Sequence, residues 1–487
     1  MFVNQYVKLR KLLKNSTILS FLLVSSSNCY LFLSNGNVYT IIKVPVSTIF
    51  YALLKNWQKK RFRRVVFSDC LFFHKFLVNN LNMTVKNPMC LKTLFLIKEN
   101  NFLIRINKQK KIPSSLYGIH IIAKRNLIDF NMIRNKTHSS LLYLFKIENI
   151  QSKILSIFFA NGIYNDVFFT NVFTNRCIYL NDKYCTYYIH EIPKKNILLS
   201  HKNLVYLINS IITQVVKNVR RGKIHGYFSS HESLTGRLSS VKPNIQNIYK
   251  QSNFRKCFNK YKYDNVFVTG DFSSFELYII SAISNDKVLI NSLLVYDFHS
   301  SLATFFLDKK VNKYINKFFR SQSKIMIFSV IYGIGISVLS KKINITYKTS
   351  LNFVKNFLTK FFKTNYYIQN ITKTSRKKIL SGLLKKKFMF NNATATNLNN
   401  IYKNISIQSA ASEVLKFAAY KMYIRIASNS FLARFSNSVH DELLLYGKFF
   451  HRYSIRSIVF NEMSYTSFLL LFNIKSLIKI YTSNYWK

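Results

Sequence analysis

The sequence predicts a multidomain protein of the α+β class, and three observations support this prediction. The length of 487 residues is enough for two to four domains. Hydrophobic residues make up 49% of the chain, so it can build real cores. Short β-prone runs lie between residues 90 and 200, whereas apolar residues recur at helical spacing over 201–220.

The chain is strongly basic. It has 72 Lys and Arg against 18 Asp and Glu, a net charge of +54. Such a charge favours a polyanionic partner, usually nucleic acid. Codon bias is a second explanation of the lysine excess, because Lys, Asn, Ile, Phe and Tyr all have AT-rich codons. An AT-biased composition fits an organelle (mitochondrion or plastid) or the cytoplasm of an endosymbiont.

Several classes of protein are disfavoured by the sequence. No stretch reaches about 18 uninterrupted apolar residues, so we expect no membrane partner. The 6 cysteines form no C-x-x-C pair, which argues against a zinc site or a disulfide framework. The opening VKLRKLLKNSTILSFLLV is typical of a targeting segment, or of an acid-poor chain in general. Residues 1–89 are therefore treated as an amino-terminal region without an assigned fold.

Four blocks carry the chemistry, in one order along the chain: GKIHGYFSSHESLTGRLSSVKPNIQNI (222–248), NVFVTGDFSSFELYIISAIS (265–284), RSQSKIMIFSVIYGIG (320–335) and SVHDELLLY (438–446). In the second block an apolar, β-prone run ends at Asp271, and in the fourth Asp441 stands at an expected hairpin turn. Two such strands can place their carboxylates side by side. The pair can then hold two divalent metals, with magnesium the natural choice beside phosphate.

The third block reads as a helix. Arg320, Lys324, Phe328 and Tyr332 recur every four residues, which keeps them on one broad side. Cations at one end suit a triphosphate, and aromatic rings at the other suit a base or sugar. In the first block, donor-rich side chains suit the sugar-phosphate backbone and the minor groove. These are Arg237, Gln246 and Asn247.

Together the four blocks resemble the signature segments of the family A DNA polymerases, over roughly residues 220–487. The resemblance implies a right-hand polymerase domain over 201–487, with a palm built on an antiparallel sheet, helical fingers and a short thumb. It also implies template-directed DNA synthesis, in which deoxynucleotides are added to a primer 3′ end by two-metal phosphoryl transfer. The expected partners are primer-template DNA and deoxynucleoside triphosphates.

The resemblance assigns roles to individual residues. Asp271 and Asp441 would bind two Mg²⁺ ions, and Glu442 would act beside them as a supporting catalytic acid. Glu276 would close the pocket against a ribose 2′-hydroxyl. The nucleotide-binding set is Glu276, His299 of the Asp297-Phe298-His299 segment, Arg320, Lys324, Phe328 and Tyr332. The DNA-binding set is Arg237, Gln246, Asn247, Asn404 and Gln408 of a PIQG-type segment, and His440.

Departures from the family pattern are few. The usual motif DYSQIELR is here DFSSFELY, so Ser274 replaces a glutamine and Tyr278 an arginine. Ile327 replaces the asparagine that usually precedes the motif B phenylalanine. None of these changes removes an expected metal ligand or triphosphate cation. They put processivity and accuracy in doubt.

Family members often carry a 3′–5′ exonuclease domain upstream, and residues 90–200 are expected to be a degenerate, RNase H-like relic of one. The stretch 149–173 resembles the middle of that domain, but residues 1–200 contain seven acids and no D-x-E. A metal site of about four carboxylates is therefore not expected, and neither is proofreading. An unrelated α/β spacer is the alternative for this region.

Three other functions compete with DNA synthesis. A single-subunit RNA polymerase or a reverse transcriptase also uses paired aspartates, although TGRLSS, Glu276 and the Arg-Lys-Phe-Tyr helix argue against both. A decayed polymerase that only binds nucleic acid is the main alternative. Retention of every expected carboxylate in so acid-poor a chain opposes it. A basic packaging protein is disfavoured by the apolar content and the ordered motifs.

Overall fold

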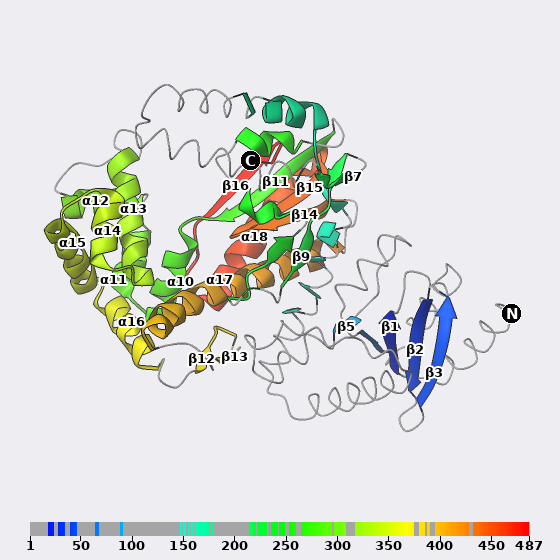
Figure 1. Ribbon diagram of the computed structural model, residues 1–487, viewed down its shortest axis with the longest axis horizontal. Coiled ribbons are helices and arrows are strands. Elements are labelled where there is room, and N and C mark those ends of the chain that lie inside the picture. The colour runs from blue at the N-terminus through cyan, green and yellow to red at the C-terminus, as the bar shows by residue number, and fades with distance from the viewer. Residues whose placement is uncertain are drawn as a thin grey trace.

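The structure is a computed structural model that describes residues 147–179, 215–307, 317–389, 395–427 and 432–486, each with some gaps, and five strands between residues 18 and 90 (Figure 1). Most of the predicted exonuclease-like region, the expected start of the thumb at residues 201–214 and residues 1–17 lie outside this description. The apolar part of the targeting-like segment is described, and it forms the strand Ile18–Leu23. No helix among the described residues is both long enough and apolar enough to span a bilayer.

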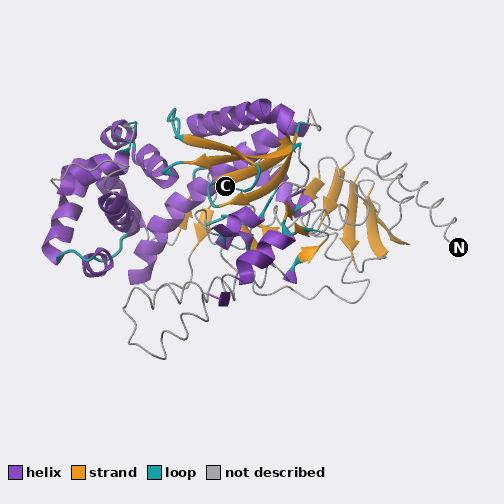
Figure 2. Cartoon of the chain, turned by 90° about the horizontal axis from the view of Figure 1, so that it is seen from above, coloured by secondary structure: helices purple, strands orange, loops and turns teal. Residues whose placement is uncertain are grey.

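The main sheet has four antiparallel strands in the order β14–β15–β11–β16. These strands are β11 (Asn265–Phe272), β14 (Ala433–Val439), β15 (Glu442–Lys448) and β16 (Ile478–Ser483). The central strands β11 and β15 are apolar and largely buried, as expected for strands covered on both faces. This sheet corresponds to the expected palm, and Figure 2 shows helices packed along it.

Helix α18 (Arg452–Leu470) packs directly on β11 and needs a glycine there. A Cβ atom added to Gly270 would lie 2.4 Å from Val459 Cγ1 and 2.6 Å from Met463 Sδ. Gly270 therefore lets the helix approach the strand that carries Asp271. This contact sets the distance between α18 and the end of β11.

Helices gathered beyond one end of the main sheet correspond to the expected fingers (Figure 1). They are α10 (Phe275–Ser284), α11 (Lys287–Leu293), α12 (Phe298–Leu307), α13 (Lys317–Tyr332), α14 (Ile336–Ile343), α15 (Tyr347–Lys360) and α16 (Phe362–Thr374). The long helix α17 (Ala395–Ala427) contacts both α16 and α18, so it joins the fingers to the palm. Helix α13 ends at Gly333, whose φ of +73° suits glycine.

Short elements complete the described chain. Strands β6 (Ile163–Tyr164), β8 (Lys223–Ile224) and β7 (Val219–Arg220) form one small sheet. Two hairpins pair β9 (Tyr227–Ser229) with β10 (Ser239–Val241) and β12 (Ile379–Ser381) with β13 (Lys387–Met389). The 3-10 helices are η2 (Ile245–Asn247), η3 (Asn253–Cys257) and η5 (Phe449–His451).

Described residues between 147 and 173, which fall within the predicted exonuclease-like region, pack against the palm. Leu155 and Phe158 belong to the same buried cluster as Phe267 of β11. The Asp166 amide donates to the Cys257 carbonyl, and Lys416 of α17 forms a buried ion pair with Glu148 at 2.7 Å. The interpretation of residues 90–200 as an exonuclease relic stays a prediction, and a short apolar helix pattern such as this one does not specify its partner.

A second sheet is formed by residues that the sequence leaves without a fold. Its strands are β1 (Ile18–Leu23), β2 (Asn28–Ser34), β3 (Tyr39–Pro45), β4 (Arg64–Phe67) and β5 (Pro88–Cys90). The order is β3–β2–β1–β4–β5, with the first three strands antiparallel and β4 and β5 parallel to β1. None of the five strands contains an Asp or Glu.

Candidate active site

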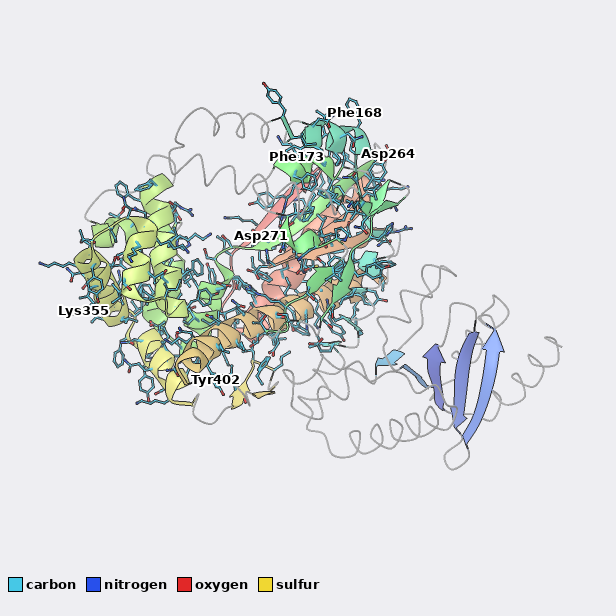
Figure 3. The ribbon with its side chains drawn as sticks, in the orientation of Figure 1. Phe168, Phe173, Asp264, Asp271, Lys355 and Tyr402 are labelled. Atoms are coloured by element: carbon cyan, nitrogen blue, oxygen red, sulfur yellow. The ribbon has the colours of Figure 1, made fainter. Side chains whose placement is uncertain are left out.

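Two aspartates meet at one end of the main sheet. In the register of β11 and β15, Asp271 pairs with Glu442, and the Phe272 amide donates to the Asp441 carbonyl at 3.3 Å. Asp441 therefore lies next to Asp271, although 170 positions separate them in the chain. Figure 3 shows Asp271 at the end of the sheet that faces the finger helices. The strand register thus brings the two aspartates to neighbouring positions, as the two apolar runs led us to expect, and their role as metal ligands stays a prediction.

A tight turn presents Asp441. Val439 pairs with Glu442, so His440 and Asp441 form a two-residue connection between β14 and β15. His440 has a φ of +51°, a left-handed conformation that is uncommon for residues other than glycine. Such conformations concentrate at functional sites. The His440 side chain is exposed at this turn, which is compatible with the DNA contact predicted for it.

Glu442 faces a buried network instead of the open end of the sheet. Its carboxylate accepts hydrogen bonds from Arg255 at 3.1 and 3.3 Å and from Trp486 Nε1 at 2.6 Å. The Arg255 guanidinium also lies 4.2 Å from the centre of the Trp486 ring. Glu442 is almost fully buried, so its hydrogen bonds hold the start of β15 in place next to Asp441. Sequence reasoning missed both partners, although one of only 2 tryptophans in the chain was a usable signal.

Arg237 connects the two acidic motifs. It donates to Glu276 Oε1 at 2.8 Å and lies 3.9 Å from Asp441 Oδ1. Burial lowers the pKa of Arg237, but the carboxylates of Asp441 and Glu276 raise it above its ordinary value. The sequence assigned this residue to DNA alone, whereas the structure also makes it the cation that balances these two carboxylates.

Glu276 lies beside the aromatic end of α13. Burial, together with the nearby Glu276 carboxylate, raises the pKa of the Tyr332 hydroxyl well above its usual value, and Gln408 of α17 opposes this shift. The Phe328 and Tyr332 rings stack with their centres 6.1 Å apart and their planes at 16°. The predicted aromatic face of the helix thus meets the predicted sugar-selecting acid in one place.

The basic end of α13 lies against the Asp297–His299 segment. Arg320 forms a two-point ion pair with Asp297, with donor–acceptor distances of 2.8 and 3.1 Å. Burial alone would raise the pKa of the Asp297 carboxyl, but the bonds from Arg320 lower it. Lys324 Nζ lies 6.0 Å from the centre of the Phe328 ring. Two predicted triphosphate cations therefore lie along one face, and Asp297 fixes the first of them.

His299 is buried between these groups. Its Nε2 lies 3.4 Å from the Ser274 hydroxyl, and its ring centre is 6.4 Å from that of Phe328. Burial, and then the charges of Arg320 and Lys324, lower the pKa of His299 to about 4. The imidazole is therefore neutral at pH 7. The replacement of glutamine by Ser274 puts a small hydroxyl at the start of α10, beside this ring.

The remaining predicted DNA contacts are spread around the same end of the sheet. Gln246 Nε2 donates to the Ser438 carbonyl at 3.4 Å, just before the turn that carries Asp441, and Asn247 is exposed in η2. Asn404 and Gln408 are half-buried one helical turn apart on α17. The other two departures are structural, because Ile327 is buried and the Tyr278 hydroxyl donates to the Leu293 carbonyl at 3.1 Å.

The carboxylate pair fits magnesium better than a tighter-binding metal. Within the described ranges, no group of three or more His, Cys, Asp or Glu could hold a metal ion. Magnesium at a phosphate site needs only one or two protein carboxylates, because water and phosphate oxygens complete its shell. Asp271 and Asp441 are both half-buried and offer only oxygen ligands. The donor set thus matches a cation that binds together with phosphate.

The fold is that of a known polymerase domain. The structure is similar to the POL domain of Pol1 from M. smegmatis, solved in complex with DNA primer-template and dNTP, with a TM-score of 0.82 and 16% sequence identity. The similarity covers 99% of this chain and 98% of that chain. At this identity the comparison shows the fold alone.

Sequence comparisons place the chain in a family. DNA polymerase I of Caldicellulosiruptor bescii is 29% identical over 257 residues, and that of Geobacillus stearothermophilus is 28% identical over 270 residues. The matched parts cover 50% and 53% of this chain but only 30% of each relative's length. The model of DNA polymerase family A matches residues 181–487, more than half of the chain. The protein therefore belongs to DNA polymerase family A.

Proposed function

We propose that the protein extends a primer 3′ end along a DNA template with deoxynucleoside triphosphates. One observation supports this most directly: Asp271 and Asp441 lie at neighbouring positions at the end of the palm that faces the finger helices, which include α13 with Arg320 and Lys324. A carboxylate pair opposite cations is what a phosphoryl-transfer site requires. Membership of DNA polymerase family A supports the same reaction.

The residues divide the work by charge. Arg320 and Lys324 bind the triphosphate, and neutral His299 offers it a ring nitrogen from the side. Asp271 and Asp441 would hold two Mg²⁺ ions, and bound ions would supply positive charge to stabilise the phosphoryl transfer. The positive charge of Arg237 offsets the electrostatic repulsion between the carboxylates of Asp441 and Glu276. Gln246, Asn247 and His440 contact the duplex near the primer end.

Glu276 selects the sugar in this proposal. Its carboxylate is held by Arg237 at 2.8 Å and lies beside buried Tyr332, so it has little freedom to retreat from a ribose 2′-hydroxyl. Phe328, stacked on Tyr332, adds a flat wall to the same pocket. Deoxynucleotides are thus preferred by exclusion of the larger sugar. This preference separates the proposal from an RNA polymerase.

Primer extension with magnesium tests the proposal. We expect the purified protein to extend a primed DNA template with deoxynucleotides and far more slowly with ribonucleotides. Asp271→Asn and Asp441→Asn should each reduce extension by three or more orders of magnitude, since each removes a charge that the reaction needs. Primer-template binding, measured by fluorescence anisotropy, should remain.

Asp264→Asn is the matched control, because Asp264 precedes the same strand at its opposite end (Figure 3). This variant should extend at the wild-type rate. Normal extension by either Asp271→Asn or Asp441→Asn would refute the metal assignment. Tight DNA binding by a wild-type protein that never extends would favour the decayed, nucleic-acid-binding alternative.

A further inference from the structure

The palm has a second exposed feature at the end of β15 away from the aspartates. The chain continues there as Phe449-Phe450-His451-Arg452-Tyr453, here called the FFHRY segment, which comprises η5 and the start of α18. The exposed fractions are 49% for Phe449, 84% for Phe450 and 68% for Tyr453. Three large aromatic residues this exposed within five positions form a surface that folding does not require.

Arg452 orders this surface. Its guanidinium carbon lies 4.0 Å from the centre of the Phe449 ring and 4.3 Å from that of Tyr453. The same group donates to the Phe449 carbonyl at 3.1 Å, and the Phe450 ring meets His451 edge-on at 5.2 Å. The Arg452 guanidinium thus contacts both the Phe449 and the Tyr453 rings and holds them in place.

The FFHRY segment is distant from the proposed active site. The Phe449 amide donates to the Asp264 carbonyl, and Lys448 pairs with Asn265 at the start of β11. Asp271 lies six residues further along that strand, which is about 20 Å at 3.3–3.4 Å per residue. Figure 3 shows Asp264 and Asp271 at opposite ends of the sheet. A ligand on this segment would not occupy the cleft.

Cations dominate this end of the sheet. Lys448 is exposed directly before the segment, and Arg434 is exposed on β14, opposite Tyr446 in register. The start of β11 adds a single acid, Asp264. Exposed aromatic rings interleaved with cations match a strand of unpaired nucleotides, because bases stack on rings of any kind and phosphates need positive charge. A partner protein with a purely apolar surface would offer these cations no negative charge.

We propose that the FFHRY segment, together with Lys448, binds single-stranded nucleic acid outside the polymerase cleft. Bases stack on Phe450 and Tyr453, and Arg452 and Lys448 contact the phosphates. Such a site would hold unpaired template or displaced strand close to the enzyme. This inference goes beyond the proposed function and does not depend on it, because an inactive protein would carry the same surface.

Binding of a labelled oligothymidylate of about 12 nucleotides, within the usual site size, tests this proposal. The full chain is first saturated with a chain-terminated primer-template, so that the cleft is filled. We expect Phe450→Ala combined with Tyr453→Ala to weaken oligonucleotide binding about tenfold or more, because each base–ring stack contributes substantially. Arg452→Gln should lower the slope of log affinity against log salt by about 0.7.

Phe460→Ala combined with Phe472→Ala is the matched control. These two rings are also exposed, at 49% and 67%, but they lie away from the FFHRY segment: Phe460 is in the middle of α18 and Phe472 follows its end. The control should bind the oligonucleotide as the wild type does, and both double variants should extend a short duplex primer normally and unfold at the wild-type urea midpoint. Equal affinity of all three proteins would overturn the proposal.

Photocrosslinking removes any dependence on the variants. With the wild-type protein and a 5-bromodeoxyuridine oligonucleotide, we expect crosslinks in the peptide that contains residues 449–453. Crosslinks confined to the cleft would refute the site. Sedimentation that shows a wild-type dimer and a monomeric Phe450→Ala, Tyr453→Ala variant, with oligonucleotide binding retained, would assign the surface to self-association and overturn the proposal equally.

Discussion

Individual arginines hold individual carboxylates throughout the site. Arg237 holds Glu276, Arg320 holds Asp297 in a two-point pair, and Arg255 holds Glu442. Arginine suits this task because its planar fork matches a carboxylate and cannot lose its charge. In a chain with four times as many basic as acidic residues, each acid can therefore be oriented by a cation of its own.

Removal of Arg255 should be strongly destabilising. Both members of its ion pair with Glu442 are almost fully buried, at 3% and 4% exposed. Arg255→Ala would leave the buried Glu442 carboxylate without its guanidinium partner, which typically costs about 3–5 kcal/mol. The free energy of unfolding in urea measures this loss.

A second variant separates the charge from the packing. Arg255→Met combined with Glu442→Leu removes both charges and keeps most of the volume, so it should recover much of the lost stability. Extension activity need not recover with it. If Arg255→Ala unfolds at the wild-type urea concentration, the buried pair does not hold β15 in place.

Stability should depend on pH through His299. Its pKa is about 4 in the folded protein and 6.5 in the unfolded chain, so the unfolded chain binds more protons between these values. The stabilisation is complete above pH 6.5 and is lost as the pH falls towards 4, by about 3 kcal/mol in total. The groups facing the imidazole are Arg320, Lys324, Asp297 and Lys479.

His299→Gln isolates this contribution. Urea midpoints at pH 7.5 and pH 5 should differ less for the variant than for the wild type, because glutamine does not titrate. The lowered pKa of Asp297 acts below this window and leaves the comparison intact. An identical pH dependence of both proteins would show that the pKa of His299 is the same in the folded protein as in the unfolded chain.

At the scale of elements, local sequence patterns predicted the strands and their ends well, but they did not predict contacts between residues far apart in the chain. An apolar run that ends in Asp271, and a second run around Asp441, were enough to place two carboxylates together, because strand pairing follows from period and length. The partners of Glu442 lie 187 and 44 positions away, and no local pattern specifies such contacts. The placement of residues 147–173 in the palm was missed for the same reason.

The contact between β11 and α18 should be very sensitive to a substitution at Gly270. Gly270→Ala would push a Cβ against Val459 and Met463 of α18, which should cost about 1–3 kcal/mol and displace the end of β11. Thermal unfolding measures the loss, and primer extension should fall with it. Gly335→Ala is the control, since no atom lies within 4 Å of its added Cβ. Equal melting temperatures would mean that helix and strand are not in close contact.

At the scale of the whole molecule, acids are concentrated where the chemistry is proposed. Four of the chain's 18 acids lie in the two strand-end motifs of the palm, whereas residues 1–68 contain none. The sheet of residues 18–90 therefore offers no carboxylate on its strands.

The protein should therefore synthesise DNA without proofreading. A 3′–5′ exonuclease site needs several carboxylates around metal ions, and the seven acids of residues 1–200 form no D-x-E pair. On a primer with a mismatched 3′ nucleotide, we expect slow extension and no shortening when magnesium is present and nucleotides are withheld. Gel analysis of end-labelled primers measures both.

Two controls make the absence of shortening meaningful. Added pyrophosphatase excludes reversal of synthesis, and Asp271→Asn removes the proposed polymerase centre while leaving β1 to β5 untouched. Shortening that persists in this variant and requires magnesium would prove a second metal site. The seven acids that precede residue 200 would be the first to replace, beginning with Asp69, which lies closest in sequence to the strands of the amino-terminal sheet.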